Sequence, residues 1–165
     1  MAYSSKAIAN EFLDLAKEED ISITPMKLQK LVYIAHGFNL AVFGDALLDE
    51  KVRAWKYGPV IDSLYYEFKS FGNRNITRKA TDVEVDDDFD IIVKEPSIPK
   101  EDDFTKRLIS IVWNKYKDLS GIQLSALTHQ DDTPWKKSYI PHVSNIIIDN
   151  NVIKEHYKEL LKEES

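Results

Sequence analysis

The sequence predicts a mainly α-helical, α+β fold: a compact bundle of six or seven helices around a central helix at about residues 25–43, with a small β element. Three observations lead to this fold class. Apolar residues recur mostly at the three- and four-residue spacing of amphipathic helices. Capping residues repeatedly precede these apolar runs. Strand-like segments do not alternate with helices, which disfavours a doubly wound α/β sheet.

The first two helices are marked by their starts. Ser4 or Ser5 can cap a helix whose apolar face carries Ile8, Phe12 and Leu15. Thr24 and Pro25 start the second helix, because threonine caps well and proline at the first helical position has no N–H that needs a partner. Apolar residues then cover much of the circumference up to Gly44. We therefore expect the second helix to be the central one.

A short β element and a corner follow. Residues 51–57 have a strand-like character, and Gly58-Pro59 separates them from another helix that stops near Gly72. We expect Gly58 to let the chain turn without a Cβ clash. We expect Pro59 to occupy the first turn of the helix, where its missing N–H is tolerated.

Residues 73–100 differ from the rest of the chain. They contain an acidic run, a strand-like stretch at residues 89–93, and Pro96 and Pro99, which forbid a continuous helix. We expect an exposed acidic excursion, such as a β-hairpin arm, that belongs to a single domain spanning residues 1–165.

Helical spacing returns after this excursion. Four further starts are marked by capping residues: Asp102 or Asp103, Ser120 with Gln123, Thr133 with Pro134, and Asp149. A short strand at residues 145–148 is expected before the last helix.

The charge is unevenly distributed. The chain carries a net charge of −6, and general nucleic-acid binding relies instead on Lys and Arg that displace counterions from phosphate. Residues 81–103 hold ten acidic residues against Lys94 and Lys100, a balance of −8 that leaves +2 for the rest of the chain. We therefore expect a nearly neutral body with a local acidic segment, and no direct DNA binding.

Composition also bears on the compartment. The chain has no cysteine, which excludes disulfides and thiolate zinc sites and suits a reducing environment. The N-terminus lacks a basic segment followed by an apolar run, and no stretch approaches the roughly 18 to 20 apolar residues of a membrane helix. We expect a cytoplasmic protein without a membrane partner.

Few residues suggest catalysis. Five scattered glycines cannot form a phosphate-binding loop. His129, Asp131 and Asp132 are the nearest approach to a metal or acid–base cluster. The acidic pair also suits the start of the next helix, and the histidine suits the end of the preceding one. We favour this second interpretation and expect no catalytic residue, metal or cofactor, so that a metal-dependent hydrolase is the weakest alternative.

Other residues could bind a partner. Lys27 and Lys30 lie one turn apart, where they could project from the solvent edge of the second helix, although a solvated flank is the simpler interpretation. Large aromatic rings favour either interfaces or the core. The candidates for partner binding are Lys27, Lys30, Tyr57 and His129. The candidates for a structural role are Trp55, Gly58, Pro59 and Trp135, the two tryptophans as core residues.

Four segments together resemble the Panacea antitoxin domain family, whose members are also described as SocA-like or phage-associated GepA-like proteins. The segments are residues 26–33 (MKLQKLVY), residues 54–60 (AWKYGPV), residues 127–129 (LTH) and Pro134-Trp135. Their order and spacing extend over about residues 5–139.

The resemblance implies a bacterial or prophage-encoded antitoxin that is not an enzyme. Its partner would be a cognate protein toxin, commonly encoded by an adjacent gene, that it neutralises by direct binding. The SocA-like branch also implies an alternative, an adaptor that delivers a toxin or other client to a cytosolic protease. Some relatives carry an added DNA-binding domain, for which this chain leaves no room, so operator binding is not expected.

Overall fold

The computed structural model of the protein describes residues 2–164. Seven α-helices lie within this range: α1 (Ser5–Glu18), α2 (Pro25–Phe43), α3 (Asp62–Phe68), α4 (Asp103–Tyr116), α5 (Gly121–His129), α6 (Pro134–Ser138) and α7 (Asn150–Glu164). A 3₁₀ turn, η1 (Lys69–Phe71), follows α3. The predicted mainly helical α+β fold is confirmed.

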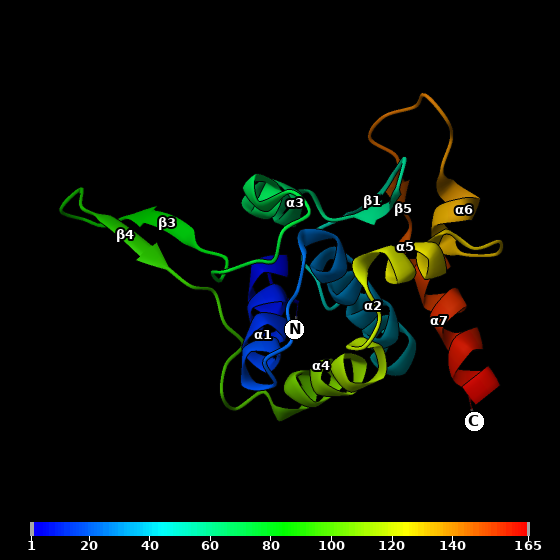
Figure 1. Ribbon diagram of the computed structural model, residues 1–165, viewed down its shortest axis with the longest axis horizontal. Coiled ribbons are helices and arrows are strands. Elements are labelled where there is room, and N and C mark those ends of the chain that lie inside the picture. Colours follow the sequence, from blue (N-terminus) through cyan, green and yellow to red (C-terminus); the bar gives the residue numbers. More distant parts are fainter. Residues whose placement is uncertain (1, 165) are drawn as a thin grey trace.

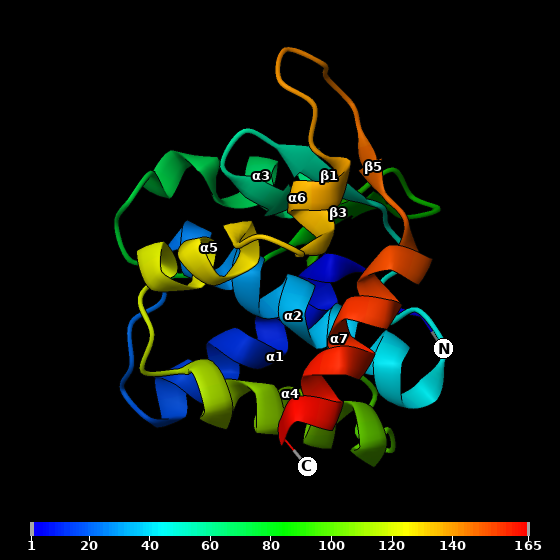
Figure 2. The same ribbon diagram turned by 90° about the vertical axis from the view of Figure 1, so that its right-hand side faces the viewer.

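Helix α2 is the centre of the bundle. It contacts α1, α3, α4, α5 and α7, which surround it in Figure 2. Every residue from Lys27 to Leu40 is buried, as expected for a helix that is apolar around most of its circumference. Thr24 caps its start by accepting from the Lys27 N–H, and Gly44 ends it in a left-handed conformation with φ of 78°. The predicted central helix and both of its ends are confirmed.

Local capping also fixes the outer helices. Ser4 accepts from Ala7 at the start of α1, Asp102 accepts from Thr105 at the start of α4, and Thr133 accepts from Lys136 at the start of α6. Ser120 and Gln123 form the reciprocal capping box expected for α5. None of the helices within residues 2–164 combines the length and apolar character that a membrane span requires.

Three short strands form a sheet against one end of the bundle: β1 (Val52–Trp55), β2 (Gly58–Val60) and β5 (Ile147–Ile148), in the antiparallel order β2-β1-β5. The expectation that Pro59 starts a helix is wrong, because it pairs with Ala54 in β2 and α3 begins only at Asp62. A proline is compatible with β2 because this strand lies at the edge of the sheet.

The predicted exposed excursion contains a separate antiparallel hairpin, β3 (Asp82–Val85) and β4 (Ile91–Lys94). We call residues 82–94 the arm. Figure 1 shows that it projects away from the helices. A hairpin was expected here, and the strand predicted at residues 89–93 begins two residues later and ends one residue later, as β4. Both segments at the base of the arm enter the core through one buried apolar residue each, Ala80 and Ile98.

Candidate functional site

The turn between β1 and β2 meets α2 and α5 at a buried point. Gly58 has φ of 124°, a backbone conformation that L side chains rarely adopt. A Cβ added there would lie 2.7 Å from the Lys30 Nζ and 3.2 Å from the His129 Cε1. The predicted structural role of Gly58 therefore has a definite cause: the absence of a Cβ leaves space for one side chain from α2 and one from α5. We call Trp55–Val60, together with Lys30, His129 and Trp135, the signature corner.

Lys30 lies inside this corner. Only 3% of its surface is exposed, and its Nζ donates to the Pro59 carbonyl oxygen at 3.0 Å. Burial disfavours the charged ammonium and lowers the pKa of Lys30 to about 8. The expectation that Lys30 projects into solvent is wrong, because other helices and β2 pack around α2. The Lys30 amino group instead holds the backbone of β2.

His129, at the end of α5, closes the other side of the corner. Its Nδ1 lies 2.7 Å from the Ser125 carbonyl oxygen, which can only accept, so Nδ1 carries the hydrogen. The Ser125 hydroxyl donates to the Tyr57 carbonyl oxygen at 3.2 Å. The imidazole also packs edge-on against Trp135, with ring centroids 4.3 Å apart. Helix α5 thus holds the turn through the Ser125 hydroxyl and contacts α6 through the His129 ring.

The two tryptophans of the corner differ. Trp135 is buried, donates from Nε1 to the Trp55 carbonyl oxygen at 2.5 Å, and stacks on Tyr139. Its predicted core role is confirmed. The predicted core role is wrong for Trp55, which is only half-buried. Its ring packs edge-on against Tyr65, with ring centroids 4.9 Å apart. Alternation along β1 turns Val52 and Ala54 inward and leaves Trp55 at the surface.

Lys27 is also buried, so its predicted position at the solvent edge is wrong. Its Nζ donates to the Lys117 carbonyl oxygen at 2.5 Å and lies 5.7 Å from the centre of the Trp113 ring. Burial lowers its pKa. The amino group satisfies a carbonyl at the C-terminal end of α4, so Lys27 joins α2 to α4.

Two buried amides with similar roles were missed by sequence reasoning. The Gln29 side chain donates to the Ile61 carbonyl oxygen at 2.9 Å and accepts from the Ile61 N–H at 3.0 Å, just before α3. Asn10 bonds the backbone on both sides of the arm. The available signal was a polar residue in a segment with little solvent-facing surface, where an amide must find partners.

Tyr57 is the member of the corner that faces solvent. Its side chain is 68% exposed at the tip of the β1–β2 turn, with the Lys56 ammonium 5.5 Å from the ring centre. Its backbone is held from below by Ser125. The corner therefore offers one exposed tyrosine ring on a rigid support, while the Lys30 amino group, the His129 Nδ1 and the Trp135 Nε1 are occupied by internal bonds.

The structure does not form the metal or acid–base cluster considered above. Asp131 and Asp132 are exposed in the turn after α5, whereas the His129 ring is directed into the corner. Within residues 2–164, no three His, Asp or Glu side chains gather closely enough to hold a metal ion. The hypothesis of a hydrolase centred on these residues gains no geometric support.

Comparisons with known proteins agree with the resemblance. The family model described as "Antitoxin SocA-like, Panacea domain" matches residues 28–136. Antitoxin SocA of Caulobacter vibrioides (strain NA1000 / CB15N) is 34% identical over 131 residues, which cover 79% of this chain and 68% of the relative. No solved structure matches the chain. The matched region begins in α2 and ends in α6, and so includes the signature corner and the arm.

Proposed function

This chain belongs to the Panacea domain family of SocA-like antitoxins, and from this membership we propose that it neutralises a cognate protein toxin by binding it directly. The supporting observation is that most of this chain is similar in sequence to a protein named as an antitoxin. The partner is a toxin encoded by an adjacent gene, and both proteins meet in the cytoplasm. The chain acts by binding rather than by catalysis.

The geometry of the signature corner agrees with a binding role. Lys30 and the Nδ1 of His129 already bond backbone carbonyls, so these groups are engaged in holding the fold. Tyr57 is the exposed ring on this support, and tyrosine and tryptophan contribute strongly to protein interfaces. We assign Tyr57 to the toxin interface, and His129 to the support behind it.

The first test is co-expression of the adjacent open reading frame with and without this gene. We expect the neighbour to arrest growth alone and growth to resume when both are expressed. A harmless neighbour, or one that stays toxic beside this protein, would contradict the proposal. If growth resumes only when a cytosolic protease is also present and the toxin then disappears rapidly, the protein acts as an adaptor instead.

The second test concerns Tyr57. The substitution Tyr57→Ala should weaken toxin binding about tenfold or more, as expected when an interface aromatic is truncated. Tyr66→Ala is the matched control, because Tyr66 on α3 is also a largely exposed tyrosine. Titration of purified toxin measures both. Equal affinities for the two variants would remove Tyr57 from the interface.

A further inference from the structure

The arm has one face that is apolar and uncovered. Its register places Val83 opposite Val93 and Val85 opposite Ile91, so these four side chains share one face of the hairpin. They are 63–72% exposed. Phe89, at the tip between the strands, is 88% exposed. Five large apolar side chains are thus in water on a segment of thirteen residues.

This arrangement is unfavourable for an isolated hairpin. A two-stranded hairpin is at best marginally stable in water, and contiguous exposed apolar patches usually mark interaction sites. The opposite face is more polar, with an ion pair of 2.8 Å between Glu84 and Lys94. The apolar face of the arm therefore has the properties of a surface that is covered in a complex.

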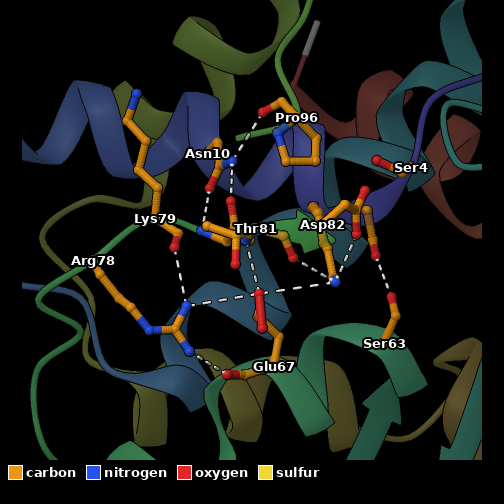
Figure 3. A network of polar contacts seen from close by, with 12 residues as sticks. Ser4, Asn10, Ser63, Glu67, Arg78, Lys79, Thr81, Asp82 and Pro96 are labelled. Atoms are coloured by element: carbon orange, nitrogen blue, oxygen red, sulfur yellow. Dashed lines mark hydrogen bonds and ion pairs between the residues drawn. The ribbon is translucent and has the colours of Figure 1, made fainter. Parts of the chain in front are cut away.

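The base of the arm is held firmly to the bundle. The Asn10 amide on α1 donates to the Ala80 carbonyl oxygen at 3.0 Å and to the Pro96 carbonyl oxygen at 2.9 Å, and its Oδ1 accepts from the Ala80 N–H at 2.7 Å. The Lys6 amino group donates to the Asp82 carboxylate at 2.9 Å. Figure 3 shows Asn10, Pro96 and Asp82 in this network of polar contacts. The arm is therefore presented at a fixed position, and little ordering is needed when a partner binds it.

Charge restricts what can cover this face. The arm carries six acidic residues against Lys94, a net charge of −5. A nucleic acid or an anionic lipid surface would be repelled by it. Two arms that met through their apolar faces would bring two such charges together. A basic protein surface with an apolar strip matches both properties of the arm, its charge and its uncovered face.

We propose that the arm docks on a basic surface of the toxin. The apolar face, formed by Val83, Val85, Ile91 and Val93, lies against an apolar strip of the toxin. The acidic tip, residues 86–90, lies against surrounding Lys and Arg side chains. This inference rests on the proposed function and adds the arm to the toxin interface to which Tyr57 is assigned. The acidic tip speeds the encounter, and the apolar face slows dissociation.

The test uses the full chain and the purified toxic product of the adjacent open reading frame. The double substitution Val83→Thr, Val93→Thr makes the face more polar and retains β-branched side chains that favour strands. We expect the Kd to rise about tenfold or more, mainly through faster dissociation. Ile122→Thr is the matched control, because Ile122 is 77% exposed and belongs to α5, which lies away from the arm in Figure 1. Its Kd should stay unchanged.

A second variant addresses the charge. Asp87→Asn with Asp88→Asn should slow association about threefold to tenfold at low salt, and the difference should shrink at high salt. Amide hydrogen exchange across residues 82–94 checks that the hairpin persists in each variant.

The outcomes separate this inference from the proposed function. If the wild-type protein does not bind the toxin, the proposed function fails and the inference fails with it. If the wild type binds and the arm variants bind within twofold of it, only the inference fails. A wild-type dimer that the Val→Thr pair converts to monomer would overturn the inference in favour of a second copy as the occupant. Salt-independent association would overturn the role of the acidic tip.

Discussion

The signature corner and the arm are built on opposite principles. In the corner, Lys30, His129 and Trp135 come from three helices. Gly58 leaves room for the first two, Lys30 donates to the Pro59 carbonyl oxygen, and Trp135 donates to the Trp55 carbonyl oxygen. In the arm, one whole face contacts no other part of the described chain closely enough to be buried. The segment that most clearly identifies the family therefore mainly builds the support and exposes Tyr57 alone of its large rings to this extent, while the larger apolar surface suited to a partner lies on the arm.

The difference follows from what burial demands. Buried polar groups must be hydrogen-bonded, so a substitution in the corner leaves a partner without its bond or creates a clash. Exposed side chains on the arm can change with little effect on the free energy of unfolding. The two regions should therefore respond oppositely to mutation: the buried residues of the corner determine stability, and the exposed residues of the arm determine partner binding.

The largest effect on stability is expected at Gly58. Gly58→Ala places a Cβ 2.7 Å from the Lys30 Nζ and forces alanine to adopt φ of 124°. We expect a loss of about 3 kcal/mol in the free energy of unfolding, from steric overlap and backbone strain together. Urea titration followed by circular dichroism measures it.

Gly44→Ala is the control for the Gly58 variant. Gly44 has a left-handed backbone with φ of 78° and ψ of −6°, and an added Cβ would meet only the Lys154 Nζ, at an ordinary contact distance of 3.9 Å. It should lose only about 1 kcal/mol, the cost of the left-handed backbone alone. Equal losses at both glycines would mean that the contact with Lys30 and His129 contributes nothing.

A smaller effect is expected from the buried amino group of Lys30. Its pKa is lowered to about 8 in the folded protein, whereas an unfolded lysine keeps its proton up to about pH 10.4. Above pH 8 the unfolded state binds more protons than the folded state, so the free energy of unfolding rises with pH. We expect a gain of about 1 kcal/mol between pH 7 and pH 9.

Lys30→Met isolates this effect, because it removes the titrating group and retains most of the side-chain volume. The rise with pH should become much shallower in the variant, with a remainder from Lys27, whose pKa burial also lowers. Guanidinium titrations at pH 7, 8 and 9 provide the slopes. The same slope in both proteins would show that Lys30 is hydrated and not part of a dry corner.

Local signals predicted the helices well but not the side chains of the corner. Caps such as Thr24 and the Ser120–Gln123 box act within four residues, so they can be read from the sequence alone. The burial of Lys30 depends on α5 and β2, which pack on α2 from distant parts of the chain. Lysine is exposed in most proteins, and only this packing reverses that expectation.

Pro59 illustrates the same limit within the backbone. A proline suits both the first turn of a helix and an edge strand, and the local sequence does not distinguish the two. Pairing of β2 with β1 decides between them. The arm was foreseen because an acidic segment with paired prolines cannot enter a helical core. Its uncovered face was not foreseen, because that depends on the strand register.

The smallest effect on stability is expected at the tip of the arm, where stability and binding should change in opposite directions. Phe89 has φ of 61° in a turn where its N–H donates to the Asp86 carbonyl oxygen at 3.0 Å. A bulky residue is strained in this conformation, whereas asparagine adopts it readily. Phe89→Asn should therefore raise the free energy of local opening of the arm, measured by amide hydrogen exchange, by about 0.5 kcal/mol.

The same change removes an apolar side chain that is 88% exposed, so toxin binding should weaken. A variant that gains protection and keeps full affinity would exclude the tip from the interface and confine docking to the strands.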